Sequence, residues 1–202
     1  MRINLAAIRA FDEHAVALSG DAVAAAAPSD LDRPTPCAGW QLRDLLAHMT
    51  AQHRGFAAAA RGRGDERGIW DARAASEDPA GDYAAAAREV VAAFAGLREA
   101  DAMLLPELAP APFPAPVAVS FHCVDYAVHA WDVARSLGRP LTVSDDLAGV
   151  ALEIALRVPD NEARRGPGTA FQRSLPARDD APVFERVLTW LGRDPAWAPP
   201  QT

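Results

Sequence analysis

The sequence FHCVDYAVHAWDVARS, residues 121–136, contains neither proline nor glycine and is long enough for about four helical turns. On a helical wheel, at about 100° per residue, its polar side chains fall within one arc of roughly 80°. These are His122, Asp125, His129, Asp132 and Ser136. Apolar side chains flank the arc on both sides, which predicts a helix buried in a bundle with one inward polar line that can bind a ligand.

Asp125 and His129 are four residues apart, so their side chains stack on adjacent turns and can both reach one divalent cation. Two ligands do not make a site, and a third is expected from another core-facing helix. The best candidates are in the helix predicted for residues 41–61, where His53 lies within the apolar stripe and His48 at its edge; His14 is a weaker candidate. Wheel geometry slightly favours His53, but spacing does not decide between the two.

The composition predicts one globular domain in a soluble, cytoplasmic protein. The chain has 202 residues, of which 50% are hydrophobic and 23% charged, enough for a substantial core. A net charge of −7 gives no electrostatic basis for binding nucleic acid. The N-terminus lacks the apolar core of a signal peptide, and no run approaches the about 18 apolar residues of a membrane span. The two cysteines, Cys37 and Cys123, are too few for a disulfide framework, and each is predicted to be a buried structural side chain.

The remaining patterns predict an all-α protein without convincing strands. Helices are expected at residues 3–27, 41–61, 83–100, 144–158 and 183–191, besides the central one. Asp82 is the expected N-cap of the third helix. The proline-rich segment 106–116 predicts an extended crossover, and the tail from Arg193 is expected to be loose. We therefore predict a four-helix bundle at residues 1–140, with a C-terminal helical extension at 141–202 packed on the same domain.

Four short motifs resemble those of one known family. They are TPCAGW at 35–40, RDLLAHM at 43–49, DYAVHAWDVA at 125–134 and LGRDP at 191–195. Together, and in this order, they resemble the DinB-like metal-binding superfamily, in the branch related to the N-terminal domain of mycothiol-dependent maleylpyruvate isomerase. The resemblance runs over nearly the whole chain.

The resemblance implies a bundle that binds a divalent metal through one histidine of the second helix and a carboxylate-x-x-x-histidine pair of the fourth. Carried over to this sequence, the ligands are His48, Asp125 and His129. The isomerase of this branch uses Glu as its carboxylate, and Asp is one methylene shorter, so metal geometry or identity is open to difference here. Zinc is the expected ion, with nickel, iron and manganese as alternatives, because mixed nitrogen and oxygen ligation suits all of them.

Three protein ligands leave a coordination position for water or substrate, the pattern of a catalytic site. The resemblance implies that a low-molecular-weight thiol, mycothiol, approaches this position, as in a thiol-dependent transferase or isomerase. One alternative is a non-catalytic metal or small-ligand binding protein with a stress or regulatory role. Another is a metal-free helical interaction protein, in which the His–Asp strip is a self-satisfied polar network. The oligomeric state stays open, with a homodimer as one possibility.

Four further polar residues are predicted around the metal. Asp132 is expected to orient a ligand imidazole rather than bind the ion directly. His122 is expected at the rim of the site, with a fourth ligand or a base as the alternative. His53 either gates the pocket or packs in the core, and Gln52 lies beside His48 at the edge of the stripe.

Overall fold

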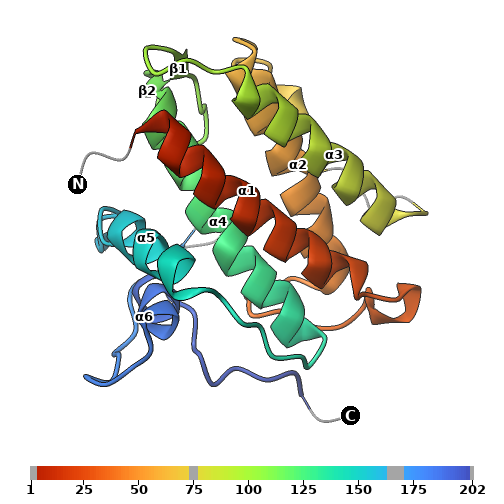
Figure 1. Cartoon of the computed structure of the whole chain (residues 1–202). Coiled ribbons are helices and arrows are strands. Elements are labelled where there is room, and N and C mark those ends of the chain that lie inside the picture. The colour runs from red at the N-terminus through yellow and green to blue at the C-terminus, as the bar shows by residue number, and fades with distance from the viewer. Residues whose placement is uncertain (1–3, 73–76, 163–170, 201–202) are drawn as a thin grey trace.

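The computed structural model describes residues 4–72, 77–162 and 171–200, and within these ranges its regular elements are helices apart from one two-stranded sheet (Figure 1). The elements are α1 (Leu5–Ala24), η1 (Pro28–Asp30), α2 (Leu42–Ala60), η2 (Arg67–Ile69), α3 (Pro79–Ala95), β1 (Ala102–Met103), β2 (Phe113–Pro114), α4 (Ala115–Ser136), α5 (Asp145–Ala155) and α6 (Val183–Trp190). The predicted all-α bundle is confirmed.

The bundle consists of two helix pairs, α1 with α4 and α2 with α3. Contacts of α1 with α3 and of α2 with α4 close it around one core. α4 is buried on nearly all sides, as its two apolar flanks predict: Val124 and Val128 on one side and Tyr126 and Val133 on the other are all buried. The polar line of α4 therefore has to be satisfied inside the bundle or at its mouth.

Two helices begin earlier than the sequence predicts. α3 begins at Pro79, and its N-cap is Asp78, whose side chain accepts a hydrogen bond from the Gly81 backbone N–H at 2.9 Å; the prediction of Asp82 was wrong. α4 begins at Ala115 and takes Pro116 into its first turn, so segment 106–116 is not extended to its end. Proline fits both positions because the first helical N–H groups have no partner within the helix.

The crossover between α3 and α4 contains the one sheet in the described ranges, contrary to the expectation of no strand. β1 and β2 pair antiparallel, with Ala102 opposite Pro114 and Met103 opposite Phe113. This pairing joins the two ends of the crossover next to the start of α4. Two residues per strand are too few for an alternating pattern, so the sequence carried no signal for it.

The C-terminal segment packs on the bundle. α5, capped by the Ser144 hydroxyl, contacts α1 and α4, and α6 packs on α5. The prediction of a loose tail after α6 was wrong. Arg193 is buried, and the Arg135 side chain donates to the carbonyl oxygens of Pro195 and Trp197 at 3.1 and 3.0 Å. The division into a core of residues 1–140 and an extension of 141–202 stays a prediction.

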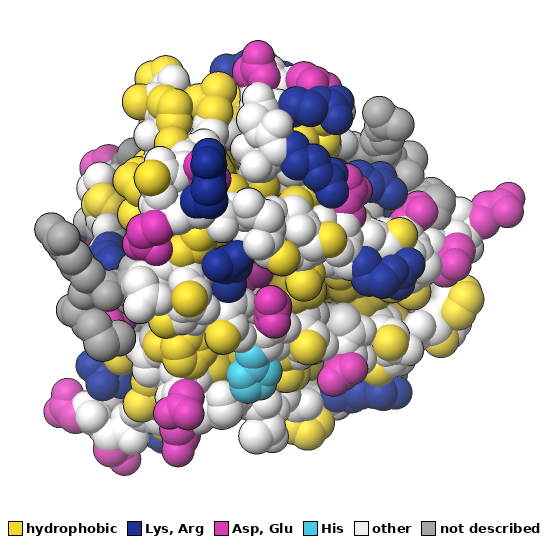
Figure 2. Space-filling view, turned by 45° about the horizontal axis from the view of Figure 1, so that its top comes forward, with side chains coloured by type: hydrophobic (Ala, Val, Ile, Leu, Met, Phe, Trp, Pro, Cys, Tyr) yellow, Lys and Arg dark blue, Asp and Glu magenta, His cyan; other side chains and the backbone are white. Residues whose placement is uncertain are grey.

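Two observations concern the outside of the described part of the chain. Among the described residues, no helix is both long and apolar enough to cross a bilayer. Figure 2 shows arginine and acidic side chains dispersed among small hydrophobic ones on one face. A groove of about 650 Å³ between α1 and α3 is lined mostly by alanine and valine. None of the three candidate metal ligands lines this groove.

Candidate metal centre

His48 of α2 and the pair Asp125 and His129 of α4 converge at one spot. Each offers a ligand atom, and these atoms all lie within 4.8 Å of one another. His129 Nε2 is 3.5 Å from Asp125 Oδ1, and the imidazole rings of His48 and His129 are 5.4 Å apart between centroids. His129 is buried, whereas His48 and Asp125 are partly exposed. The predicted trio therefore lies where the polar line of α4 reaches solvent.

The turn before α2 fixes the position of His48. The Thr35 hydroxyl lies within hydrogen-bond distance of the carbonyl oxygens of Cys37 and Trp40, at 3.1 and 3.0 Å, and Gly39 takes a left-handed φ of 82° that closes the turn. The Trp40 ring consequently lies against His48, with centroids 4.9 Å apart. The TPCAGW motif thus forms a hydrogen-bonded turn that packs the Trp40 ring beside one candidate ligand.

The donor set fits a divalent cation. Nitrogen and carboxylate ligands at about 2.1 Å from a tetrahedral ion lie about 3.4 Å from one another. The 3.5 Å between His129 Nε2 and Asp125 Oδ1 matches this separation without movement of α4. Two imidazoles and one carboxylate suit zinc and also nickel, iron and manganese.

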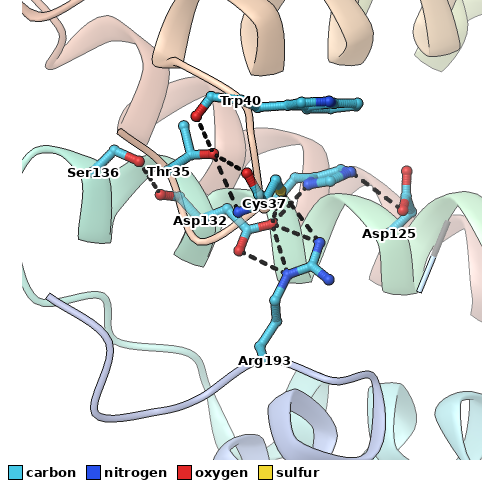
Figure 3. A network of polar contacts seen from close by, with 8 residues as sticks. Thr35, Cys37, Trp40, Asp125, Asp132, Ser136 and Arg193 are labelled. Atoms are coloured by element: carbon cyan, nitrogen blue, oxygen red, sulfur yellow. Dashed lines mark hydrogen bonds and ion pairs between the residues drawn. The ribbon is translucent and has the colours of Figure 1, made fainter. Parts of the chain in front are cut away.

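His129 contacts the Asp132 carboxylate, which in turn contacts the Arg193 guanidinium; Figure 3 shows Asp132 and Arg193. His129 Nδ1 is 2.9 Å from Asp132 Oδ2, which leaves Nε2 facing Asp125. Arg193 donates to both oxygens of Asp132, from Nε to Oδ1 at 3.1 Å and from Nη2 to Oδ2 at 3.2 Å. Burial alone would raise the pKa of Asp132, but Arg193 and His129 outweigh it and hold that pKa at about 2. Asp132 thus makes the contact expected of an orienting residue, while Arg193 was missed because its segment lacks helical periodicity.

The two candidate ligand histidines differ in their preferred charge. Burial and the neighbouring His129 lower the pKa of His48 to about 4. Burial also opposes protonation of His129, but Asp125 and then Asp132 outweigh it and raise the pKa of this imidazole well above its usual value. A cation at the site therefore competes with a proton on His129, because ligating imidazoles are neutral.

A second group of ligand-type side chains, Cys37, His129 and Asp132, also lies within 4.8 Å. It is the poorer cation site, because Arg193 occupies both Asp132 oxygens and its Nη2 is 3.4 Å from Cys37 Sγ. Burial and the Asp132 carboxylate also raise the pKa of the Cys37 thiol, which disfavours a thiolate. Cys37 itself is partly exposed rather than buried, and its thiol donates to Asp132 at 3.3 Å. The prediction that Cys123 lies in the core is confirmed.

His122 and His53 form a separate polar network deeper in the bundle. His122 Nδ1 is 2.6 Å from Asp12 Oδ1, and its Nε2 is 3.0 Å from His53 Nδ1. All three side chains are buried, so the prediction of His122 at the rim was wrong. His53 stacks on Tyr126 with ring centroids 3.8 Å apart, as a core residue does. Asp12 was missed because its helix pattern marked only apolar positions.

Gln52 is buried, and its amide donates to Glu107 Oε2 of the crossover at 3.0 Å. This bond places a carboxylate of the crossover beside α2, one turn after His48. That Gln52, His53 and His122 assist a metal site stays a prediction.

Comparison with known proteins places these observations in a family. Residues 13–134 match the family described as mycothiol maleylpyruvate isomerase N-terminal domain, and this span contains His48, Asp125 and His129. Uncharacterized proteins from two strains of Mycobacterium tuberculosis are each 28% identical over 172 residues, which is 81% of this chain and 85% of the relative.

Two crystal structures share the fold. The mycothiol-dependent maleylpyruvate isomerase superposes with a TM-score of 0.56 at 12% identity, and a mutant of that enzyme with a TM-score of 0.59 at 9% identity. Each similarity covers 76% of this chain and 68% of the other. At these identities the likeness concerns the fold alone.

Proposed function

Because the chain belongs to the family of mycothiol maleylpyruvate isomerase N-terminal domains, we propose that it binds one divalent metal ion and acts on a low-molecular-weight thiol, as a transferase or isomerase. The ligands we propose are His48, Asp125 and His129. The observation that carries the proposal is their convergence within 4.8 Å at a partly exposed position of an otherwise buried helix. A self-satisfied polar network would bury all three.

The protein groups around this position have distinct tasks. Asp132 holds His129 by Nδ1, so that Nε2 points to the shared spot. Trp40 packs on His48 and limits the positions that its imidazole can take. His48 and Asp125 form the accessible side, where a small thiol can approach. A bound divalent ion would supply Lewis-acid chemistry there, lowering the pKa of a coordinated water or thiol toward neutrality.

Zinc is the ion we propose first, since two imidazoles and a carboxylate with an open position are typical of catalytic zinc. Nickel, iron and manganese accept the same donors, so the metal has to be identified on the purified protein. Mycothiol is the thiol we propose, by membership of the family; a second small molecule would be the acceptor or the isomerised substrate.

The test uses the full chain loaded with Co²⁺, which reports its ligands in the visible and near-ultraviolet spectrum. We expect a thiolate-to-cobalt charge-transfer band on addition of mycothiol, and no band in the presence of a chelator. A screen of mycothiol with electrophilic acceptors and with maleylpyruvate then tests turnover. Metal binding without a band for mycothiol, glutathione or cysteine would contradict the thiol-dependent enzyme and favour a binding protein.

A further inference from the structure

The geometry points to Arg193 as a positioning residue of the metal site, acting on His129 through Asp132. This inference rests on the proposed metal-binding function. Arg193 comes from the segment after α6, outside residues 13–134 that match the family, so it brings the C-terminal part of the chain into the site. It does not touch the proposed ion; it fixes the carboxylate that fixes a ligand.

The contacts form a buried chain of three side chains. The guanidinium donates to both Asp132 oxygens, at 3.1 and 3.2 Å, and Asp132 Oδ2 is 2.9 Å from His129 Nδ1. Exposed fractions are 5% for Arg193, 0% for Asp132 and 3% for His129, so water does not compete for these bonds. A planar guanidinium held against both oxygens fixes the plane of a carboxylate as well as neutralising it. Figure 3 shows Arg193 and Trp40 on opposite sides of Asp132.

The LGRDP motif forms the turn that directs the Arg193 side chain toward Asp132. Leu191 is fully buried and anchors the end of α6. Gly192 then takes a left-handed φ of 81°, and the Arg193 backbone N–H donates to the Leu188 carbonyl at 2.8 Å. A Cβ at Gly192 would lie 2.6 Å from Gln172 Cβ, so the close turn also requires glycine for space. The turn sends the Arg193 side chain back into the bundle rather than along the tail.

Fixing Asp132 decides which nitrogen of His129 is available to a metal. Because Nδ1 contacts the carboxylate, Nε2 is the nitrogen whose lone pair can bind a metal, and it is the one that faces Asp125. Loss of a residue that orients a ligating imidazole in this way typically weakens metal binding about 10- to 100-fold. Without the guanidinium, Asp132 loses the two hydrogen bonds that set the plane of its carboxylate.

The experiment compares Arg193→Ala with Arg135→Ala. Arg135 holds the same C-terminal segment through the carbonyl oxygens of Pro195 and Trp197, but none of its described contacts reaches Asp132, so its variant controls for loosening of the tail. We expect the Kd for Zn²⁺, measured by competition with a chromophoric chelator, to rise about 10- to 100-fold in Arg193→Ala and to stay unchanged in Arg135→Ala. The visible spectrum of the Co²⁺ form should change only in Arg193→Ala.

Two further variants test whether Arg193 acts through Asp132. Asp132→Asn should weaken Zn²⁺ binding by a similar factor, and adding Arg193→Ala to it should cost little more, because both changes break one chain of contacts. Arg193→Lys restores the charge without the fork and should recover part of the affinity; it also serves if Arg193→Ala does not fold.

Three results would each overturn the assignment of Arg193 without affecting the metal site. The first is wild-type Zn²⁺ affinity and a wild-type cobalt spectrum in every Arg193 variant that folds. The others are a loss of affinity in Arg135→Ala equal to that in Arg193→Ala, and fully additive losses in the variant that combines Asp132→Asn with Arg193→Ala. Absence of metal binding by the wild-type protein would overturn the metal site as well.

Discussion

Replacing His48 by alanine removes one proposed ligand at little cost to the fold. His48 is partly exposed, and its ring contacts are with Trp40 and His129. Its side chain makes no hydrogen bond within residues 4–72, 77–162 and 171–200. Truncation of such a side chain should lower the free energy of unfolding in chelator by about 1 kcal/mol. His129→Ala would be harder to interpret, because it also leaves Asp132 without one of its partners.

The effect on metal-dependent stability should be much larger. At a free metal concentration of 100 times the Kd, binding adds about 2.7 kcal/mol to the free energy of unfolding. For a chain of this length that corresponds to a rise in Tm of roughly 5–11 °C. If loss of His48 raises the Kd about 100-fold, the same metal concentration adds only about 0.4 kcal/mol, a rise of roughly 1–2 °C.

The assay is thermal unfolding followed by circular dichroism, in chelator and in Zn²⁺, Ni²⁺, Fe²⁺ or Mn²⁺, with bound metal counted by elemental analysis. His14→Ala is the matched control, since His14 is exposed on α1, and it should keep the wild-type gain in Tm. If His48→Ala keeps that gain with every metal, His48 is not a ligand. If the wild-type protein gains nothing and carries no metal, the metal site itself is refuted.

Three further changes test the packing of the bundle and of the turn that carries Arg193. Because burial and then His122 hold the pKa of His53 well below its usual value, only the unfolded chain takes up this proton. His53 by itself should therefore lower the free energy of unfolding by about 1.4 kcal/mol per pH unit as pH drops from about 6.5 to 5. In His53→Phe this contribution to the pH dependence of the free energy of unfolding, measured in urea at several pH values, should be absent. An unchanged pH dependence would contradict a neutral His53. Gly192→Ala should lower the free energy of unfolding, measured in urea, by more than about 2 kcal/mol, because φ is 81° and the new Cβ would lie 2.6 Å from Gln172 Cβ. It should also weaken Zn²⁺ binding, and wild-type values for both quantities would contradict the close turn. Gly55→Ala places a Cβ 2.3 Å from the Trp70 ring and should cost about 1–3 kcal/mol with a shift in tryptophan fluorescence, whereas a neutral change would show that η2 moves freely.

The local patterns of the sequence predicted the bundle and half of the site. Periodicity gave the helices, and the four-residue spacing of Asp125 and His129 gave a pair on one face of α4. Spacing did not separate His48 from His53, because a helical wheel gives the direction of a side chain but not its depth along the bundle. In the structure the difference is one of depth: His48 lies next to the turn that carries Trp40, whereas His53 is fully buried against Tyr126.

The rest of the site depends on pairings between distant parts of the chain. Arg193 and Asp132 are 61 residues apart, and His122 and Asp12 are 110 residues apart. A single sequence contains no information on such pairs. The tail appeared loose because it has proline, glycine and no apolar period, yet its order comes from the two oxygens of Asp132 and from Arg135, not from local structure.

α4 carries two polar layers of similar composition, and their surroundings give them different capabilities. In the inner layer Asp12, His122 and His53 bond to one another at no more than 1% exposure, and of their ring nitrogens and carboxylate oxygens only His53 Nε2 is a buried atom without a partner in the described part of the chain. Apart from that atom, the layer is a self-satisfied polar network of the kind expected in a structural core. In the outer layer Asp125 and His129 meet His48 at 4.8 Å or less with two members partly exposed, so an ion can enter and a ligand can follow it. The same two residue types therefore stabilise the bundle at one level and leave metal-binding atoms available at the next, which is why we propose the metal site in the outer layer.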